Sequence, residues 1–341
     1  MNENIINIIK NVFTLNHIEI NIKGLEKKPF NMVITSKIQN LKSINKLNLI
    51  IKTLEKILNT NIKYNFDIEN NFILYIESHE NIIINNFDFI LKKGLQENPG
   101  NKKNDVVFLG IDKTTNKPIF ESLNNTKSIL LGGTSGGGKS IFLHNIILSY
   151  LILNHENYIF LIDPKYTEFS FYNKRILKNR LILEVGNNYN DYIKIFSYLE
   201  SILKSRFQTM QKKQIQKSDE SPILLVIDEY AQLFKNRKEK KIINDYILKL
   251  SSLGRACNIY LILATQHPTN ENINNTIRAN LQSRICLKCE NIQQSKNIID
   301  TTEGTKILNS GEAILKIDGS IKKHYIKSCF LSSESIKKYL Q

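Results

Sequence analysis

The chain has 341 residues, and 41% of them are hydrophobic, which is enough to build buried cores in two or three domains. Lys and Arg outnumber Asp and Glu by 47 to 32, so the formal net charge is +15. A basic excess of this size favours an anionic partner such as nucleic acid. A solvated lysine surface is the alternative explanation. Residues 105–341 carry 33 basic and 22 acidic side chains, so most of the excess belongs to this part.

Two features of the chain argue against secretion and against membrane insertion. The start, Met1–Asn4, is polar and lacks the basic segment of a signal peptide. The most apolar stretch, Ile141–Leu153, has 13 residues and includes His144, so it is too short and too polar for a bilayer. Together these observations predict a cytoplasmic protein without a membrane span.

Residues 1–104 are expected to form a small α+β subdomain followed by a linker. Asn16–Gly24 alternates apolar and polar residues as a half-buried strand does, and Asn71–Ser78 is a second strand candidate. Ile44–Leu58 repeats its apolar residues at helical spacing. The segment Lys92–Asn104 is polar and contains Pro and Gly, which predicts a long loop. The second domain is then expected to span residues 105–341.

Strands and helices alternate after residue 105. Apolar runs predict strands at Val106–Gly110, Ile129–Gly132, Tyr158–Asp163, Leu181–Val185, Ile223–Asp228, Asn258–Thr265, Arg284–Lys288 and Ala313–Ile317. Helices are predicted at Lys139–Leu153, Asn190–Gln214, Lys240–Leu253 and Gln293–Thr301. Such alternation is typical of a mostly parallel sheet with helices on both faces. The ligand site of such a sheet lies at the carboxyl ends of its strands.

A complete phosphate-binding loop follows the strand at Ile129–Gly132. It matches G-x-x-x-x-G-K-[ST] and comprises Gly133, Thr134, Ser135, Gly136, Gly137, Gly138, Lys139 and Ser140, with Ile141 continuing into the helix. Its glycines let backbone N–H groups turn toward an anion. Lys139 is expected to reach the β- and γ-phosphates of ATP, and Ser140 to bind Mg²⁺. The dipole of the following helix favours the same anion.

Two adjacent acids end the strand at Ile223–Asp228. In a nucleotide hydrolase the first, Asp228, holds Mg²⁺ opposite Ser140, and the second, Glu229, polarises the attacking water. A base beside the magnesium ligand favours hydrolysis over a small-molecule kinase. Together with the phosphate loop upstream, the pair predicts a nucleotide hydrolase.

The apolar strand at Asn258–Thr265 is followed by Gln266, His267 and Pro268. If this strand lies between those that carry the phosphate loop and the acids, Gln266 can sense the γ-phosphate; a polar strand end before a turn is the alternative. His267 is interpreted as a loop residue. Hydrolysis also needs a positive charge on the transferred phosphoryl group, and Arg255 or Arg284 could supply it from a neighbouring subunit.

Cys286 and Cys289 form an isolated C-x-x-C pair inside a predicted strand. No second pair is close to it in the sequence, so a buried thiol pair in a reducing compartment is preferred to a zinc or redox site.

Taken together, these motifs resemble the motor of the FtsK/SpoIIIE DNA translocases. The resemblance rests on the phosphate loop, Ile162–Lys165 (I-D-P-K), Ile227–Leu233 (V-D-E-[FY]-A-x-L), Ala264–Pro268 (A-T-Q-R-P), Ile277–Ile285 (I-x-x-N-x-x-x-R-I) and Ser295–Asp300 (S-x-x-I-x-D). His267 replaces the usual arginine of the fourth motif. The membrane region and the winged-helix module of the family are not found.

The resemblance implies a RecA-like ATPase that forms a homo-hexameric ring around double-stranded DNA, with ATP bound between subunits. Lys139, Ser140, Asp228, Glu229 and Gln266 would then act in their own subunit, and Arg255 or Arg284 on the neighbour. The expected DNA contacts are lysines on late loops, namely Lys296, Lys306, Lys322 and Lys323.

The setting implied by the resemblance is DNA transfer, segregation or packaging for a mobile element, phage or plasmid. A membrane protein or a recruiting protein such as a relaxase would be supplied in trans. The main alternative function is a protein-secretion ATPase of the type VII kind, which shares the fold and the loop. A nucleotide-binding scaffold without hydrolysis is a further alternative, which the intact Lys139, Asp228 and Glu229 disfavour.

Overall fold

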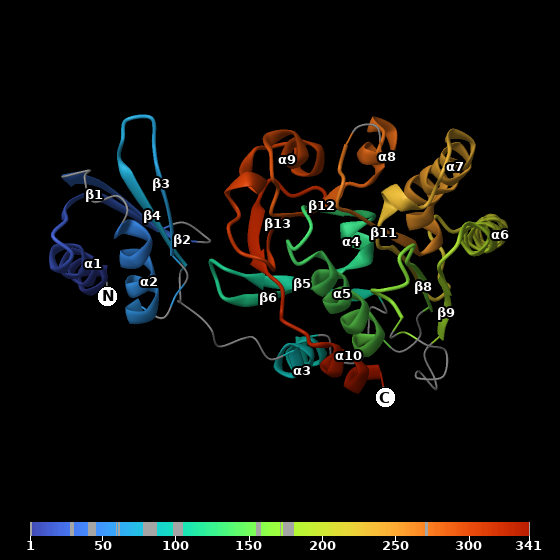
Figure 1. Ribbon diagram of the computed structural model, residues 1–341. Helices are drawn as coiled ribbons and strands as arrows, with labels where there is room; N and C mark the ends of the chain where they lie inside the picture. Colours follow the sequence, from blue (N-terminus) through green and yellow to red (C-terminus); the bar gives the residue numbers. More distant parts are fainter. Residues whose placement is uncertain are drawn as a thin grey trace. The chain divides into compact units, whose positions relative to one another are not determined.

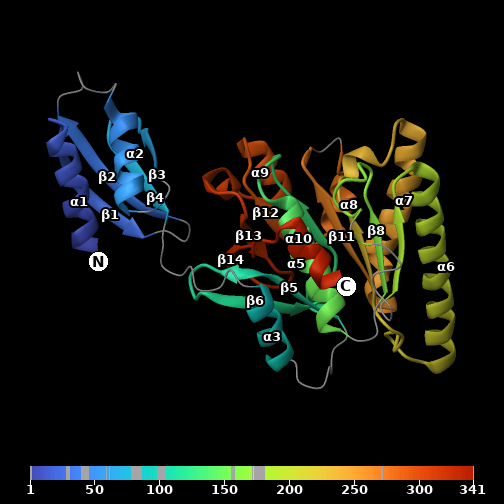
Figure 2. The ribbon, with the colours of Figure 1, turned by 60° about the horizontal axis from the view of Figure 1, so that its bottom comes forward.

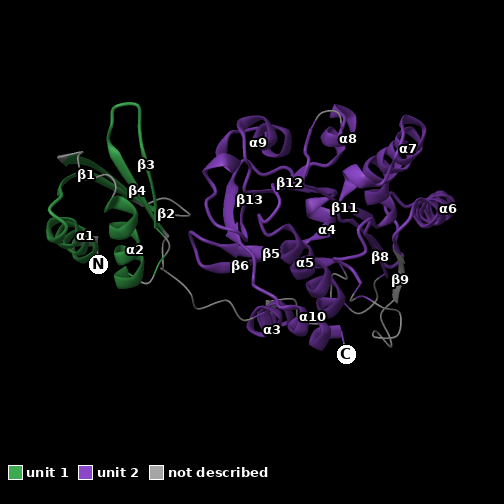
Figure 3. Ribbon diagram, viewed as in Figure 1, with its two compact units in different colours: residues 1–82 green, residues 83–341 purple. Residues whose placement is uncertain are grey.

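The computed structural model describes residues 2–27, 31–39, 46–58, 60, 62–77, 87–97, 105–154, 158–170, 172, 181–269 and 272–340. The chain divides into two compact units, residues 1–82 and residues 83–341, called the first and second unit below (Figure 3). Each is described by itself. Among the described residues, no helix combines the length and the apolar character that a membrane crossing requires.

The first unit is a four-stranded antiparallel sheet with two helices, in the strand order β1-β2-β4-β3 (Figure 1). In chain order its elements are α1 (Asn2–Leu15), β1 (Glu19–Lys27), β2 (Asn31–Gln39), α2 (Leu47–Leu58), β3 (Ile62–Phe66) and β4 (Phe72–Glu77). Phe13 of α1 packs edge-on against Phe72 of β4, and Leu54 of α2 is fully buried in the same core. The predicted small α+β subdomain is thus confirmed as a fold. The elements α1, β2 and β3 were not predicted individually.

The second unit is built on a ten-stranded sheet in the order β6-β5-β14-β13-β12-β7-β11-β10-β8-β9 (Figure 2). Its strands are β5 (Val106–Asp112), β6 (Lys117–Ser122), β7 (Ile129–Gly132), β8 (Tyr158–Ile162), β9 (Leu181–Gly186), β10 (Ile223–Ile227), β11 (Ile259–Thr265), β12 (Ser283–Leu287), β13 (Glu312–Lys316) and β14 (Lys323–Lys327). Its α-helices are α3 (Phe87–Glu97), α4 (Leu123–Thr126), α5 (Lys139–Leu153), α6 (Tyr189–Lys213), α7 (Arg237–Leu253), α8 (Asn275–Asn280), α9 (Ile292–Ile299) and α10 (Ser333–Leu340). Short 3₁₀ turns lie at η3 (Tyr230–Gln232), η4 (Gly254–Cys257) and η5 (Glu303–Lys306).

The six strands from β12 to β9 run parallel, and both faces of this part are buried, as predicted. Successive side chains of a parallel strand are buried in two different hydrophobic cores, one on each face of the sheet. In β10, Leu224 and Val226 face the core that includes α5, whereas Ile223, Leu225 and Ile227 face the core formed with α6 and α7. Burial on both faces explains why the parallel strands are almost continuously apolar.

The other end of the sheet is antiparallel, because β13, β14, β5 and β6 each pair with a neighbour of opposite direction. The strands β6 and β14 were not predicted. Pro118 lies in β6, which is the edge strand, where a residue without an N–H is tolerated. This extension makes the sheet mixed, while the RecA-like α/β class is confirmed.

The two units separate between residues 82 and 83, upstream of the boundary predicted at residue 105. The boundary differs because the helix α3 includes the first half of the expected loop Lys92–Asn104. Residues 98–104 lie outside the described residues. Phe87 of α3 contacts the rings of Phe108 and Tyr339, and the Tyr339 hydroxyl donates to Asp88 at 2.7 Å. These contacts anchor α3 in the second unit.

Candidate nucleotide site

The phosphate loop connects β7 to α5 and has the backbone shape that an anion cradle requires. Gly136 and Gly138 adopt φ values of 73° and 96°, in the left-handed region that favours glycine. The Gly137 N–H donates to the Thr134 carbonyl at 3.1 Å, which closes the turn. Gly138 then caps α5, so the positive end of the helix dipole lies at the loop.

Close backbone packing fixes the loop on two sides. A Cβ atom at Gly133 would lie 2.7 Å from the Cβ of Leu287 in β12. A Cβ atom at Gly138 would lie 2.6 Å from the backbone nitrogen of Gly311, and the Gly311 N–H donates to the Gly137 carbonyl at 3.0 Å. The glycines are therefore required both for the turn and for the approach of the segment that leads into β13.

The strand order places the predicted site residues at one edge of the sheet. The strand β11 lies between β7, which leads into the phosphate loop, and β10, which ends before Asp228. The residue after β8 is Asp163, and the Asp228 N–H donates to the Ile162 carbonyl at 3.0 Å. Because these parallel strands end together, Thr265, Asp228 and Asp163 converge beside the loop.

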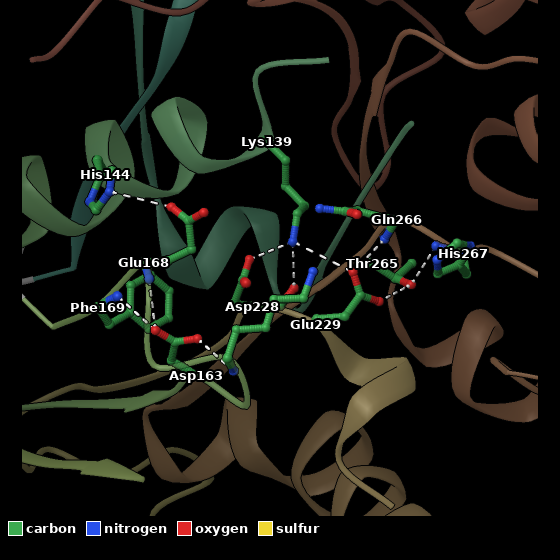
Figure 4. Close-up of polar contacts among 11 residues, drawn as sticks. Lys139, His144, Asp163, Glu168, Phe169, Asp228, Glu229, Thr265, Gln266 and His267 are labelled. Atoms are coloured by element: carbon green, nitrogen blue, oxygen red, sulfur yellow. Dashed lines mark hydrogen bonds and ion pairs between the residues drawn. The ribbon is translucent and has the colours of Figure 1, made fainter. Parts of the chain in front are cut away.

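Lys139 is paired with both acids of the β10 motif (Figure 4). Its Nζ atom lies 2.5 Å from Asp228 Oδ1 and 3.7 Å from Glu229 Oε2, and it also donates to the Asp228 carbonyl at 3.1 Å. All three side chains are almost fully buried. Burial raises the pKa of Asp228; the charge of Lys139 opposes this rise, and the nearby carboxylates Glu168 and Asp163 add to it. The arrangement is an ion pair in which one ammonium group offsets part of the charge of the two acids.

Glu229 is held by β11. Its Oε1 accepts from the Thr265 hydroxyl at 2.9 Å, and its Oε2 accepts from the Gln266 N–H at 2.9 Å. The His267 N–H in turn donates to Thr265 Oγ1 at 3.0 Å, and the His267 side chain is exposed, in agreement with a loop position. The side chain of Gln266 points toward Lys139 in Figure 4. Thr265 was not predicted as a site residue, because its contact with Glu229 depends on which strands are neighbours.

The loop after β8 adds residues that the sequence did not assign to the site. Asp163 is fully buried and accepts three backbone hydrogen bonds, from the N–H groups of Lys165, Glu168 and Phe169 at 2.8–3.1 Å. His144 of α5 lies behind this loop and is buried. The I-D-P-K motif, Ile162–Lys165, had marked this loop in the sequence, but it gave no role in the site to the residues of the loop.

The donor set fits Mg²⁺ and a nucleotide. Ser140 lies in the first turn of α5, directly after Lys139, whose ammonium group contacts Asp228. Mg²⁺ prefers oxygen ligands and takes one or two from protein, with the others from phosphate and water. Ser140 and Asp228 would hold the ion, and the glycine turn would hold the phosphates.

The two candidate arginines differ in their surroundings. Arg284 in β12 is buried, and its guanidinium donates to the carbonyls of Ile298 at 2.8 Å and Arg278 at 2.6 Å. Burial lowers its pKa. Arg255 in η4 is exposed, and its Nε donates to Asn124 Oδ1 at 3.3 Å.

The lysines expected to contact DNA lie on the part of the second unit from α9 to β14. Lys296 on α9, Lys306 at the end of η5 and Lys322 before β14 are exposed. Lys323 differs, because its Nζ pairs with Glu303 Oε2 at 2.5 Å and is partly buried. The structure thus leaves three of the four available to an external anion.

The cysteine pair is a pair of buried thiols. The Sγ atoms of Cys286 and Cys289 are 3.6 Å apart, and neither residue is in a disulfide. The burial expected of both thiols is confirmed, while the preference for a thiol pair over a zinc or redox site stays a prediction.

Comparison with known proteins finds sequence relatives for the central region of the chain. Residues 101–222 match the sequence profile of the FtsK/SpoIIIE family. Among curated relatives, the DNA translocase FtsK of Halalkalibacterium halodurans is 28% identical over 257 residues, covering 68% of this chain and 32% of the relative. The FtsK of Staphylococcus aureus strain Mu50 is 30% identical over 270 residues, covering 72% and 33%. The chain therefore spans about a third of the length of these relatives.

Two solved structures show the same fold. The conjugation coupling protein TcpA of pCW3, in a monomer form with ATPγS, superposes with a TM-score of 0.72 at 20% identity and covers 97% of each chain. The cytoplasmic domain of the type VII secretion ATPase EccC of Thermomonospora curvata gives a TM-score of 0.58 at 14% identity, covering 71% of this chain and 31% of EccC. At these identities the matches establish the fold.

Proposed function

Since the chain carries an FtsK/SpoIIIE family domain with a P-loop ATPase fold, we propose that it is an ATP-driven motor that moves double-stranded DNA. The observation that carries the proposal is the convergence of Lys139, Asp228 and Glu229 on the phosphate loop, with Glu229 oriented by β11. These are the groups that phosphoryl transfer to water requires.

Each residue has a defined task in this proposal. Lys139 exchanges its contact with Asp228 for the β- and γ-phosphates, and the loop N–H groups bind the same phosphates. Ser140 and Asp228 would hold Mg²⁺, which would supply positive charge to the phosphate oxygens. Glu229 accepts the proton of the attacking water, while Gln266 contacts the γ-phosphate side of the site.

The motor is proposed to work as a ring, with Arg255 acting on the neighbouring subunit. Arg255 precedes β11, whereas the nucleotide site lies at the carboxyl end of that strand. Seven residues of strand separate the two ends by roughly 20 Å, so Arg255 cannot reach the nucleotide of its own subunit. The buried guanidinium of Arg284 is already bound to two carbonyls, which favours a structural role for it.

Double-stranded DNA is the proposed substrate. Lys296, Lys306 and Lys322 are exposed cations on one region of the second unit, which also carries most of the basic excess. Contacts of lysines to phosphates are independent of sequence and weaken with salt. The fold shared with a conjugation coupling protein along the whole chain makes DNA transfer the first setting to test. Recruiting partners would act in trans.

A protein-secretion ATPase is the second candidate. The observation that favours it is the fold shared with EccC, over 71% of this chain. The two functions differ in the polymer that stimulates hydrolysis.

The deciding experiment measures ATP hydrolysis with and without long duplex DNA, at low and high salt. We expect strong stimulation by DNA that fades with salt, because phosphate contacts release counterions. The Lys139→Ala variant should lose the activity. Hydrolysis by the wild-type protein that is indifferent to DNA would overturn the translocase proposal and favour the secretion ATPase.

A further inference from the structure

One buried carboxylate, that of Asp163, holds the backbone of the loop after β8. Asp163 Oδ1 accepts from Lys165 N–H at 3.1 Å, and Oδ2 accepts from the N–H groups of Glu168 and Phe169 at 2.8 and 2.9 Å. Three such bonds fix the backbone around residue 168. The direction of the Glu168 side chain is therefore set by the fold of the loop.

The loop brings Glu168 to the magnesium side of the nucleotide site. Ile162 and Ile227 are partners in the parallel pairing of β8 and β10, so Asp163 and Asp228 follow them side by side. In Figure 4 the Glu168 carboxylate lies between His144 of α5 and the Asp228 region. Its negative charge contributes to the raised pKa of Asp228, as expected of a nearby carboxylate. About 31% of the Glu168 side chain is exposed, so it is accessible from the site.

His144 of α5 lies next to the Glu168 carboxylate. Its Nδ1 is within 2.8 Å of the Tyr172 hydroxyl, and its Nε2 is 4.0 Å from Glu168 Oε2. Burial lowers the pKa of His144 to about 4, so the imidazole is neutral near pH 7. Phe169 and Tyr172 pack against the ring and fix its orientation. On this side Glu168 therefore faces a neutral imidazole and not a cation.

We propose that Glu168 is a positioning residue for the hydrated magnesium ion of the bound nucleotide. Its carboxylate, oriented by Asp163 and flanked by His144, accepts hydrogen bonds from the hydration shell of the ion, next to the direct ligand Asp228. Magnesium ions in nucleotide sites retain several waters, and outer carboxylates commonly orient them. This inference rests on the proposed function, because it assigns a further residue to the same nucleotide site.

Glu168 is distinct from the proposed base Glu229. Glu229 is fully buried, and both of its oxygens are bound by β11. Glu168 belongs to the loop after β8, whereas Glu229 directly follows Asp228 at the end of β10 and is held from the side of β11. One is placed for the attacking water and the other for the cation.

The experiment measures the affinity of the full chain for ATPγS as a function of Mg²⁺ concentration, together with the affinity in EDTA. Glu168→Gln keeps the size of the side chain and removes its charge. We expect the half-saturating Mg²⁺ concentration to rise about tenfold or more, while the affinity in EDTA stays close to that of the wild type. Glu334→Gln, on the exposed face of α10, is the matched control and should change neither quantity.

The outcomes separate this inference from the proposed function. If wild-type protein fails to bind ATPγS, both are overturned. If wild-type protein binds with a Mg²⁺ dependence that Glu168→Gln leaves unchanged, only the role of Glu168 is wrong. An equal loss of affinity with Mg²⁺ and in EDTA also overturns it, because Glu168 would then act on the nucleotide or on the fold rather than on the cation.

Discussion

At the scale of single residues, the main feature of the site is that Lys139 already has anionic partners. Its contacts with Asp228 and Glu229 are the kind that it would make with phosphates. Nucleotide binding is therefore an exchange, in which phosphates replace carboxylates around one ammonium group. Unpaired buried carboxylates are unfavourable, so entry of a cation beside Asp228 must accompany the exchange. In the proposed function, the phosphate loop and the residues that would bind magnesium therefore act as one site.

The first residue-scale prediction concerns pH. Burial lowers the pKa of His144 from 6.5 to about 4. The unfolded chain takes up a proton as pH falls from 6.5 toward 4, whereas the folded chain does not, so the folded state loses stability over this window. At about pH 5 the loss from this group is about 2 kcal/mol.

Urea unfolding at about pH 7.5 and about pH 5 measures this effect as a change in the free energy of unfolding. His144→Phe should show a smaller decrease between the two pH values than the wild-type protein. His267→Asn, on an exposed loop, should keep the wild-type decrease. Equal decreases in His144→Phe and in wild-type protein would contradict the assignment.

At the scale of elements, asparagine starts several helices of the second unit. Asn188, Asn236, Asn274 and Asn291 precede α6, α7, α8 and α9, and each side chain accepts from a backbone N–H three residues later. An N-cap side chain satisfies a donor that the helix leaves unpaired. The abundant Asn of this sequence therefore has a structural use.

Removing one cap tests this role. Asn236 accepts from the Glu239 N–H at 3.0 Å. We expect Asn236→Ala to lower the free energy of unfolding by about 1 kcal/mol, and Tm by about 2–4 °C. Lys241→Ala, an exposed change within the same helix, should shift Tm by less. Thermal unfolding followed by circular dichroism distinguishes them, and an equal shift in the two variants would argue against the cap.

Sequence patterns best predicted the helices and strands that are buried on all sides. The helix Lys139–Leu153 and the strand Ile129–Gly132 were predicted with the bounds that the structure has. The strand β14 was not predicted, because its sequence is Lys-His-Tyr-Ile-Lys and only Ile326 among these residues is buried. In the site, motif residues could be assigned to strand ends, but contacts such as Thr265 with Glu229 depend on strand order, which one sequence does not specify. His144 was not assigned to the site, because it lies in a helix whose residues are mostly apolar.

At the scale of the whole molecule, the proposed ring makes hydrolysis a property of two subunits. A mixture of Lys139→Ala and Arg255→Ala proteins tests this directly. Each variant alone should hydrolyse ATP at least about 10³-fold more slowly than wild type, because each interface lacks either the lysine or the arginine. In the mixture, interfaces that join an intact phosphate loop to an intact Arg255 should restore measurable activity.

The matched control is Arg237→Ala, which removes an exposed arginine from α7 and should retain wild-type hydrolysis. Hydrolysis rates are measured over a range of mixing ratios, with maximal recovery expected at intermediate ratios. Absence of recovery, with both proteins shown to assemble, would mean that Arg255 does not act across an interface.

The contact between Gly138 and Gly311 also has a mechanical consequence. The start of α5 and the segment that enters β13 touch through their backbones, with no side chain between them to absorb movement. β13 continues through the turn that carries Lys322 into β14. We expect a displacement of the phosphate loop to press directly on this hairpin, which is about 15 Å long as estimated from its five-residue strands. Because β12 and β5 pair with the hairpin on its two sides, the force would pass into the sheet.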